Sequence, residues 1–383
     1  MQDAGKSVIV AFMLGESATR LTQSGFLNID ATLAAAYLEK GLFDTVYWLT
    51  YDANDAEVLA QLKAEGKIAQ GIELLTPPSW ANRGLGKLWY SVAAPWIHRQ
   101  QFRAAEACIC QQTSGSWTGF IGKLLFGTRF VYRYGHSLWR RHWDRKQWLR
   151  LAFSWPLDRI LTRFSDHTLV CTHLDYHNNR HIRTVTLCPN FIDTRSINDL
   201  PPWAERQERA VYVGRLMSFK NVFNMVEACA RVGWPLEVFG DGPLRQEMMA
   251  HAEKVGAEVI FHGIQPNEVI REHLPSFKYH LLVSNFEGMP KALLEGMAAG
   301  SLCLVTPIFG CTEIIDDGIN GLVAGGEDVD SLVALFEKAK TADGQRLGEQ
   351  AVAKIHSHYS LERVVELHQQ ALFDQPPIVS AQT

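Results

Sequence analysis

The sequence lacks several features of membrane and secreted proteins. Its seven cysteines include no CxxC pair, and we interpret them as reduced core thiols in a cytoplasmic protein. The longest weakly polar stretch, residues 292–310, is interrupted by Glu295, three glycines and Pro307, whereas a membrane span needs about 20 mostly apolar residues. No small-residue cleavage site follows the apolar run at residues 8–14, so we expect a first β-strand there and not a signal peptide.

Charge is sparse and unevenly distributed. Charged residues make up 20% and hydrophobic residues 47% of the 383 positions, which excludes a disordered or fibrous chain and predicts about two domains. Residues 1–200 contain 22 Lys and Arg against 17 Asp and Glu, whereas the rest of the chain contains 15 against 24. Because the formal net charge is −4 and no recognised binding module is present, a nucleic acid is not expected as a partner.

Basic residues are concentrated between positions 129 and 163. This segment has nine Lys and Arg against Asp144 and Asp158, with tryptophans at positions 139, 143, 148 and 155. Basic residues mixed with tryptophan at helical spacing fit a helix that touches an anionic membrane surface or binds an anionic acceptor. They also fit a solvated helix whose tryptophan face packs on its own sheet. The sequence leaves both interpretations open.

Short apolar runs alternate with amphipathic stretches along the chain, which predicts repeated β-α units and parallel sheets. The expected strands are residues 8–14, 45–49, 71–75, 107–110, 129–133, 168–171, 185–187, 210–213, 236–239, 259–262, 280–284, 302–306 and 321–323. A polar stretch at residues 194–208 is the expected interdomain linker. We therefore predict an α/β fold of two tandem Rossmann-like, doubly wound domains that face a cleft. The first domain would span residues 1–200 and the second residues 201–358, and residues 359–383 would form a helix returning to the first domain, followed by a frayed tail.

The first candidate site follows the strand expected at residues 210–213. The sequence predicts a tight turn at Gly214 and a loop that enters a helix near Asn221. Such a turn exposes backbone N–H groups at the positive end of a helix, and Arg215 and Lys220 add two cations. This combination suits a diphosphate. Solvation of two basic side chains beside a turn would explain Arg215 and Lys220 equally well.

Two carboxylates eight positions apart form the second candidate site. Glu287 lies in a loop before a helix expected to start at Pro290, and Glu295 lies inside that helix. Beside the backbone N–H groups of Gly288 and Met289, the carboxylate of Glu287 can accept hydrogen bonds from sugar hydroxyls. A helix-interior Glu among Ala, Leu and Met is costly to bury without a partner, and a ribose diol would be such a partner. Ordinary salt bridges of both carboxylates would explain the pattern as well.

Taken in order, these motifs resemble glycosyltransferase family 4, the glycosyl transferases group 1. The resemblance is carried by Gly214-Arg215 with Lys220, Gly240-Asp241-Gly242-Pro243, His262-Gly263, the Glu287 and Glu295 pair, and residues 310–321. It is specific over about residues 211–339, and residues 188–193 resemble the family's Pro-Asn-Gly-x-Asp turn with Phe191 in place of Gly. The resemblance implies a GT-B architecture and a retaining hexosyltransferase that uses a nucleotide-diphosphate-sugar donor, with no required metal or other cofactor.

The resemblance also implies a role for each matching residue. Arg215 and Lys220 would hold the donor diphosphate and stabilise it as a leaving group, because fixed cations offset the negative charge that develops there. Glu287 would contact the transferred sugar near the reacting centre, Glu295 the ribose, and the backbone at Ile264 the base. The residues expected to bind the donor are Gly25, Gly214, Arg215, Lys220, Ile264, Glu287, Gly288, Met289 and Glu295.

The first domain matches the family less closely. Gly25 resembles a residue of the Gly-rich acceptor-side loop, but the usual double Gly is absent, so Gly25 is either a phosphate contact or a plain turn. Where the family often has a His after the fourth strand, this sequence reads Cys-Gln-Gln-Thr at residues 110–113. We therefore expect His136 to line the cleft and contact the transferred sugar.

Two further patterns have the spacing of metal-binding motifs. His173, His177 and His181 recur every four residues, which suits one helix face, but no Cys lies near them and we expect no metal. Asp328-Val329-Asp330 resembles the Asp-x-Asp motif of the other major glycosyltransferase fold. It stands where a helix is expected to begin, and we interpret it as a helix cap.

The main hypothesis is a retaining glycosyltransferase that acts on a glycan or lipid-linked acceptor in polysaccharide or glycoconjugate biosynthesis. Its expected location is the cytoplasm, with a peripheral position on the cytoplasmic face of the membrane left open. The alternatives are a sugar-nucleotide epimerase of GT-B-like shape, which would need additional acid/base carboxylates, and a catalytically silent subunit that binds donor or glycan. The intact set of Arg215, Lys220, Glu287 and Glu295 argues against a loss of activity.

Overall fold

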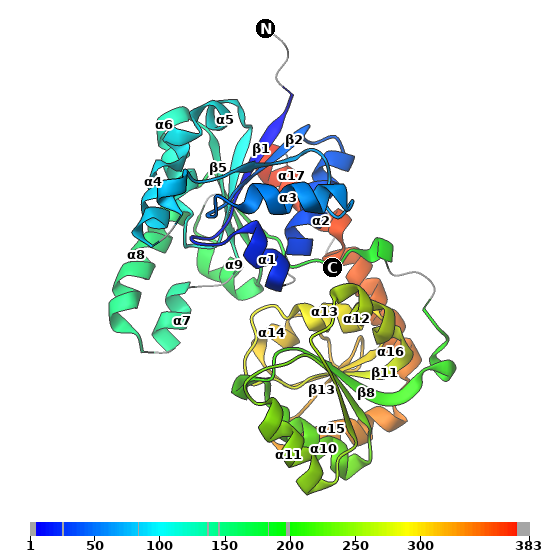
Figure 1. Ribbon diagram of the computed structural model, residues 1–383. Helices are drawn as coiled ribbons and strands as arrows, with labels where there is room; N and C mark the ends of the chain where they lie inside the picture. Colours follow the sequence, from blue (N-terminus) through cyan, green and yellow to red (C-terminus); the bar gives the residue numbers. More distant parts are fainter. Residues whose placement is uncertain are drawn as a thin grey trace. The chain divides into compact units, whose positions relative to one another are not determined.

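The chain forms two compact units in the computed structural model, which describes residues 5–24, 27–82, 84–135, 138–144, 146–182, 184–196 and 200–373. Unit 1 comprises Met1–Pro189 and Val364–Thr383, and unit 2 comprises Asn190–Arg363. Figure 1 shows a sheet with helices in each unit. The division between the units follows Pro189 rather than residue 200, because Asn190 donates a side-chain hydrogen bond to the carbonyl oxygen of Met289 in unit 2 (3.1 Å).

Unit 1 is built on a seven-stranded parallel sheet of order β3-β2-β1-β4-β5-β6-β7. Its strands are β1 (Ser7–Ala11), β2 (Thr45–Leu49), β3 (Ile72–Leu75), β4 (Ala107–Gln111), β5 (Arg129–Tyr134), β6 (His167–Val170) and β7 (Val185–Leu187). Its helices before the chain enters unit 2 are α1 (Ala18–Ser24), α2 (Leu27–Glu39), α3 (Asp55–Ala64), α4 (Leu85–Ile97), α5 (Arg99–Ala104), α6 (Trp117–Phe126), α7 (Leu138–Asp144), α8 (Trp148–Phe164) and α9 (His173–Asn179). The central strand β1 is buried along its whole length, as a parallel strand covered on both faces must be.

The last helix, α17 (Leu361–Phe373), packs on unit 1 from Val364 onward. His368 is fully buried, and its Nδ1 hydrogen-bonds to the hydroxyl of Tyr37 on α2. Near the end of α17, the carbonyl oxygen of Ala371 accepts a hydrogen bond from Arg129 Nε (3.1 Å). These contacts anchor a segment that is distant in sequence against the first sheet.

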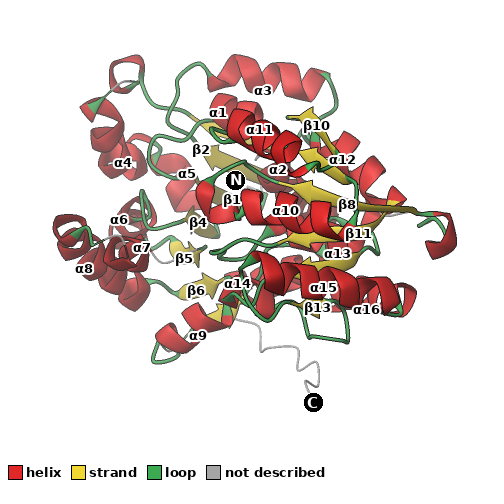
Figure 2. Cartoon of the chain, turned by 90° about the horizontal axis from the view of Figure 1, so that it is seen from below, coloured by secondary structure: helices red, strands yellow, loops and turns green. Residues whose placement is uncertain are grey.

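Unit 2 is built on a six-stranded parallel sheet of order β10-β9-β8-β11-β12-β13. Its strands are β8 (Gln207–Val213), β9 (Leu236–Phe239), β10 (Val259–Gly263), β11 (Phe277–Leu282), β12 (Leu302–Val305) and β13 (Leu322–Val323). Its helices are α10 (Val222–Val232), α11 (Arg245–Val255), α12 (Asn267–His273), α13 (Lys291–Ala298), α14 (Phe309–Thr312), α15 (Val329–Thr341) and α16 (Gly344–Lys354), and a π-helical turn at Ile355–Tyr359 follows. Figure 2 shows the strands in yellow and the helices in red.

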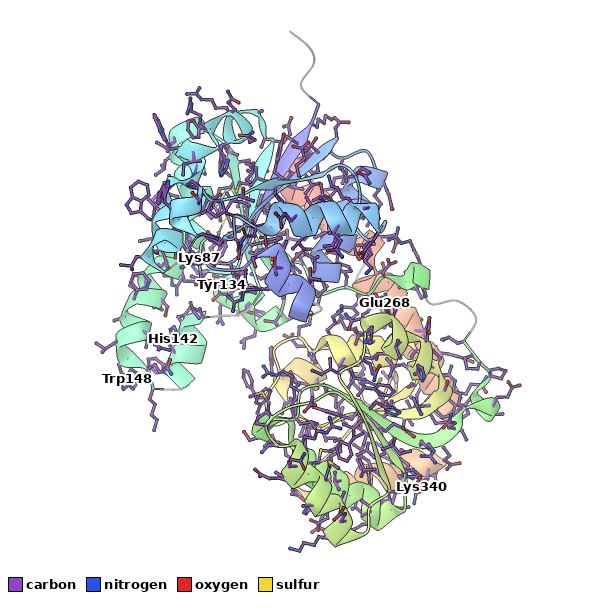
Figure 3. All side chains as sticks on the ribbon, viewed as in Figure 1. Lys87, Tyr134, His142, Trp148, Glu268 and Lys340 are labelled. Atoms are coloured by element: carbon purple, nitrogen blue, oxygen red, sulfur yellow. The ribbon has the colours of Figure 1, made fainter. Side chains whose placement is uncertain are left out.

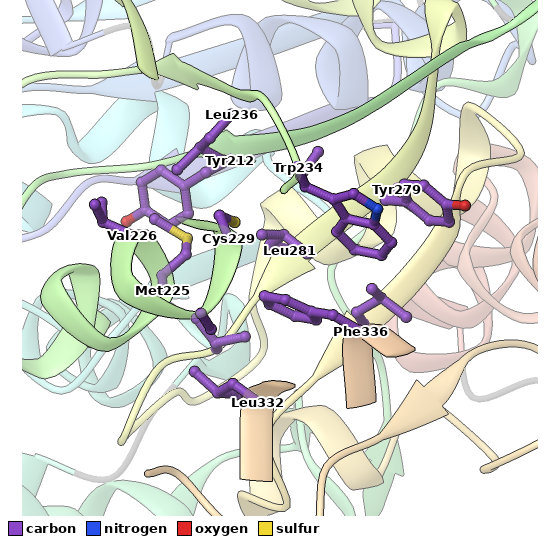
Figure 4. Packing of buried hydrophobic residues seen from close by; sticks show 14 of the residues in the cluster. Tyr212, Met225, Val226, Cys229, Trp234, Leu236, Tyr279, Leu281, Leu332 and Phe336 are labelled. Carbon is purple, nitrogen blue, oxygen red and sulfur yellow. The ribbon is translucent and has the colours of Figure 1, made fainter. Parts of the chain in front are cut away.

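Aromatic stacking fills one face of the second sheet (Figure 4). The ring of Trp234 lies 4.0 Å from that of Tyr279 and 5.2 Å from that of Phe336, nearly parallel to both. Such pairs add about 0.5–1.5 kcal/mol each beyond the free energy of burying their apolar area. This core holds β8, β11 and α15 rigidly beneath the loops at the carboxyl ends of the strands.

The predicted α/β class and doubly wound sheets are confirmed, and each expected strand is present within a few residues of its predicted bounds. Asp328 caps α15, since its carboxylate accepts a hydrogen bond from the backbone N–H of Ser331 (2.9 Å), as expected from its position. Of the two interpretations of residues 129–163, the one in which the tryptophan face packs on the sheet is wrong for three of the four tryptophans. Trp143, Trp148 and Trp155 are exposed. Among the described helices, none has both the length and the apolar content of a membrane span.

Candidate functional site

Arg215, Lys220 and Glu287 lie on loops at the carboxyl ends of the unit 2 strands. Strands β8 and β11 are neighbours in the sheet. From β8 the chain continues to β9 on one side, and from β11 it continues to β12 on the other. Such a topological switch point is where doubly wound sheets bind ligands. The loop after β8 carries Arg215 and Lys220, and the loop after β11 carries Glu287.

The loop after β8 is held by the side chain of Tyr212 and by the loop after β9. The hydroxyl of Tyr212 donates to the carbonyl oxygen of Arg215 (3.0 Å), and the N–H of Leu216 donates to the carbonyl oxygen of Asp241 after β9 (3.0 Å). Lys220 ends a 3₁₀ turn, Ser218–Lys220, and α10 follows directly. The side chain of Arg215 is exposed at the surface of this loop.

Two glycines after β9 allow the loop after β8 to approach closely. A Cβ added at Gly240 would lie 1.9 Å from the carbonyl oxygen of Gly214, and one at Gly242 would lie 2.4 Å from that of Leu216. Both distances are far below a van der Waals contact, so side chains at these positions would push the β8 loop away. The Gly-x-Gly segment after β9 therefore sets the position of Gly214 and, through it, of Arg215.

The loops after β8 and β11 meet through an ion pair. Lys220 Nζ contacts Glu287 Oε1, and the same oxygen accepts a hydrogen bond from Ser284 Oγ (2.8 Å). The N–H of Asn285 donates to the carbonyl oxygen of Phe219 (2.8 Å). The side chains of Lys220 and Glu287 are 14% and 11% exposed, so water screens their attraction less than at an open surface. Lys220 and Glu287, which are 67 positions apart in the sequence, thus form one charged site.

The backbone at residues 287–289 is fixed from the adjacent loop. A Cβ added at Gly310, at the start of α14, would lie 2.3 Å from the carbonyl oxygen of Gly288 and 2.6 Å from that of Glu287. On its other side Gly288 is open, since no heavy atom lies within 4 Å of a Cβ built there. Met289 and the cap residue Pro290 precede α13. The loop is therefore supported from beneath and accessible from outside.

Glu295 lies inside α13, with a side chain that is 12% exposed. Burial raises the pKa of Glu295 above its ordinary value, while the positive charges of Lys291 and Arg271 oppose this shift. Lys291 Nζ lies 3.7 Å from the carboxylate, too far for a hydrogen bond of normal length. The carboxylate is thus partly desolvated, and hydroxyl donors from a ligand would stabilise it.

The other predicted residues are Ile264, Gly25 and His136, together with the histidines that have metal-motif spacing. Ile264 directly follows β10 at the edge of the same carboxyl end of the sheet, and its side chain is 82% exposed. Gly25 and His136 lie outside the described residues, so their predicted roles stay predictions. His181 contacts Arg159 NH1 through Nε2 (2.9 Å). Within the described ranges, no set of three His, Cys, Asp or Glu side chains is placed to hold a metal ion.

Two contributors were not singled out from the sequence. Ser284, just after β11, orients the carboxylate of Glu287, and the signal for it was a hydroxyl residue at the end of a buried apolar strand. Arg271 on α12 acts on Glu295 from 24 positions away, and nothing in the local sequence pattern indicates this interaction.

Comparison with known sequences finds a family match in the second half of the chain. Residues 194–352 match the family described as Glycosyl transferases group 1. Lipopolysaccharide 1,6-galactosyltransferase of Salmonella typhimurium (strain LT2) is 28% identical over 191 residues, covering 44% of this chain and 53% of that protein. The protein of the same name from Escherichia coli (strain K12) is 27% identical over 240 residues, covering 57% and 66%. The aligned regions thus span about half to two thirds of these relatives.

Solved structures resemble the whole chain. Lipopolysaccharide outer core galactosyltransferase WaaB, in its apo form, matches with a TM-score of 0.69 and 16% identity over 96% of this chain and 99% of that chain. Anabaena Alr3699/HepE in complex with UDP matches with a TM-score of 0.73 and 14% identity over 96% and 100%. At such identities the likeness shows the fold alone. Residues 194–352 thus match the family of glycosyl transferases group 1, and the two Rossmann-like units have the GT-B fold.

Proposed function

We propose that the protein is a retaining hexosyltransferase that transfers a sugar from a nucleotide-diphosphate-sugar donor to a glycan or lipid-linked acceptor in polysaccharide or glycoconjugate biosynthesis. The observation that carries the proposal is the contact of Lys220 with Glu287 at the switch point of unit 2, beside the exposed Arg215. Two cations and one carboxylate at this position match the charges that cleavage of a sugar-diphosphate bond develops.

The leaving group sets the first requirement. As the bond between the sugar and the diphosphate breaks, negative charge grows on the departing phosphate, and preorganised cations stabilise it. Arg215 and Lys220 come from one loop whose backbone is held by Tyr212 and by the loop after β9. Little reorganisation is then required when the charge appears. We propose on this basis that the two side chains neutralise the diphosphate and that no metal ion is needed.

The sugar sets the second requirement. Positive charge develops on the sugar ring, and a carboxylate close to it is stabilising. Glu287 is held by Ser284 and Lys220, so its carboxylate is oriented before the donor arrives. The open side of Gly288 leaves room for sugar hydroxyls next to that carboxylate. In this proposal Glu295, deeper in α13, accepts hydrogen bonds from the ribose diol, and Ile264 lies near the base.

A uridine diphosphate hexose is the donor that we propose to test first. Two relatives are named galactosyltransferases, and a solved structure of the same fold is described in complex with UDP. A polysaccharide or a lipid-linked glycan is the acceptor class that the relatives' names suggest.

Thermal unfolding in the presence of nucleotide sugars tests the donor assignment. A ligand at 100 times its dissociation constant adds about 2.7 kcal/mol to the free energy of unfolding. We expect a clear shift with one nucleotide series, lost in Glu295→Ala and kept in Glu253→Ala, which removes an exposed carboxylate on α11. No shift with UDP-, GDP-, ADP-, dTDP- and CMP-sugars would contradict donor binding.

Transfer itself is tested with purified protein, the identified donor and an extract of lipid-linked glycans. We expect release of the nucleoside diphosphate and a product whose NMR spectrum shows the anomeric configuration of the donor. Donor binding without nucleotide release would instead indicate a silent subunit. Conversion of the donor sugar without any acceptor would indicate an epimerase.

A further inference from the structure

Helix α8 buries a row of polar side chains, beside Leu161, and exposes several large apolar ones. Ser154, Asp158 and Thr162 recur every four residues and are buried. Asp158 accepts a hydrogen bond from the hydroxyl of Tyr132 (2.9 Å), and Ser154 Oγ contacts His142 Nδ1 (3.0 Å). Burial raises the pKa of Asp158 to about 6. A helix that only covered a core would bury its large apolar side chains and not expose them.

The outer side of α8 is a continuous apolar stripe. Leu149, Phe153, Pro156, Ile160 and Phe164 are all exposed and are separated by four, three, four and four positions, which places them on one helix face. Leu149 is 92% and Phe153 69% exposed. The rings of Trp143 and Trp148 meet edge-to-face at 5.6 Å where the stripe begins.

Helix α4 repeats this arrangement. It buries Tyr90, Ser91, Ala94 and Pro95. Its large exposed apolar side chains include Leu85, Trp89, Val92 and Trp96, which lie at helical spacing. Leu85 is 83% and Trp89 63% exposed, and Trp80, just before α4, packs edge-to-face on Trp89 at 5.7 Å. Two helices of one unit thus present large apolar residues to the outside.

The two stripes belong to one side of unit 1. Helix α6 packs against both α4 and α8, and it exposes Leu124 and Leu125. Figures 1 and 2 both place α4, α6 and α8 along the same side of unit 1, and Figure 3 labels Lys87 on α4 and Trp148 on α8. We name the surface formed by α4, α6, α7 and α8 the apolar face. Contiguous exposed apolar surfaces of this kind on single chains mark interaction sites.

The sequence around the apolar face is strongly basic and rich in tryptophan. Residues 76–164 contain 14 Lys and Arg against three Asp and Glu, in a chain with a net charge of −4. They also contain eight of the 11 tryptophans. The basic side chains Arg99, Arg150 and Arg163 are exposed, and Arg159 lies over the ring of Trp155 (5.7 Å).

We propose that the apolar face docks on an anionic lipid bilayer, with the exposed stripes of α4 and α8 inserted at the headgroup level. Large aliphatic side chains supply the apolar area that partitions into the interface. Tryptophan is the residue type enriched at that depth. The surrounding basic side chains are attracted to anionic headgroups. Charge complementarity selects a bilayer as the occupant over a second copy of this chain, because two copies would bring together two surfaces of the same sign. This proposal stands independently of the transferase function.

Vesicle sedimentation of the full chain tests the docking. The vesicles contain phosphatidylcholine alone or with about one third phosphatidylglycerol, which gives the negative surface that the proposal requires. We expect the protein to sediment with the anionic vesicles and much less with the neutral ones. Leu149→Glu with Phe153→Glu should lower the partition coefficient at least tenfold, because two of the most exposed apolar side chains would become charged. The matched control is Ile319→Glu, an exposed apolar residue of unit 2, which should bind as the unchanged protein does.

Charge variants and fluorescence complete the test. Arg150→Gln with Arg163→Gln should weaken binding to anionic vesicles severalfold and leave circular dichroism unchanged, since both side chains are exposed. Brominated lipids should quench the tryptophan emission of the unchanged protein. The proposal is overturned if the unchanged protein stays in the supernatant, or if the double apolar variant binds as well as the control. A dimer in light scattering that the apolar variant converts to monomer would also overturn it, because the face would then be covered by a second copy.

Discussion

Neutralising either partner of the Lys220 and Glu287 pair should change nucleotide affinity in opposite directions. The two groups are in contact without any ligand, and both side chains are largely buried. If Lys220 holds the donor diphosphate, the carboxylate of Glu287 competes with the diphosphate for the same ammonium group. Lys220→Met should therefore weaken binding of a nucleoside diphosphate, and Glu287→Gln should strengthen it. Both changes should lower turnover.

The expected magnitudes follow from the contacts. A hydrogen bond to a charged group is worth about 1.5–3 kcal/mol, so Lys220→Met should weaken nucleotide binding by roughly 10- to 150-fold. Removing one nearby like charge is worth about 1 kcal/mol at a partly screened site, so Glu287→Gln should tighten binding by roughly fivefold. Loss of a group that stabilises developing charge lowers turnover by at least about tenfold. The hydrogen bond from Ser284 can persist in Glu287→Gln, since an amide oxygen also accepts.

Calorimetry with UDP and the other nucleoside diphosphates measures the affinities, and release of nucleotide measures turnover. The matched control is Lys254→Met, which removes an exposed lysine of α11 and should change neither quantity. Urea unfolding of each variant separates loss of binding from loss of fold. Leaving Glu287 without its ion-pair partner should itself cost about 1–3 kcal/mol of stability.

Two results would refute this reasoning. Equal nucleotide affinity in Lys220→Met and the unchanged protein would remove Lys220 from the diphosphate site. Weaker nucleotide binding in Glu287→Gln, at unchanged stability, would show that the carboxylate assists the ligand rather than competing with it, and the assigned roles would have to be revised.

Three further results are expected. Gly310→Ala should lower turnover strongly at a smaller cost in stability, because its Cβ would lie 2.3 Å from the carbonyl oxygen of Gly288 and displace that loop; steady-state kinetics and urea unfolding check this. Gly296→Ala should lower the free energy of unfolding by about 1–3 kcal/mol, because its Cβ would lie 2.4 Å from the ring of His280. This steric cost outweighs the roughly 1 kcal/mol by which helix propensity favours Ala over Gly. A higher melting temperature of the variant would contradict the prediction. Burial lowers the pKa of His98 and of His280 to about 4, so stability is full above pH ~6.5 and declines as the pH falls toward 4, by up to about 3 kcal/mol for His280; urea unfolding across this range should show a shallower decline in His280→Leu.

Much of the fold could be predicted from the sequence because parallel strands are buried on both faces. Such strands form short apolar runs that are visible in a single sequence, and the run at residues 236–239 coincides with β9, which is buried along its whole length. The boundary between the two units was harder to predict from the sequence. A polar, proline-rich stretch predicted a linker around residue 200, whereas the structure divides after Pro189.

The candidate site was only partly predictable. Motif spacing indicated Arg215, Lys220 and Glu287 separately, and the resemblance to a family gave them roles. Their juxtaposition depends on β8 lying beside β11, a pairing of strands that are far apart in sequence. Ser284 and Arg271 contribute through contacts made in three dimensions, so no local pattern singled them out.

The amino-acid sequence by itself determined the periodicity of the elements and the chemistry available at each loop, because strand burial, glycine turns and charged residues are local properties. The tertiary structure alone decided which loops meet and which face of each helix is outside. The ion pair of Lys220 and Glu287 exists because a parallel sheet brings the carboxyl ends of β8 and β11 to one edge. The apolar face exists because α8 buries Ser154 and Asp158 against Tyr132 and His142. The amphipathic pattern of a helix shows two unlike faces, but only the packing partners decide which of them is turned inward.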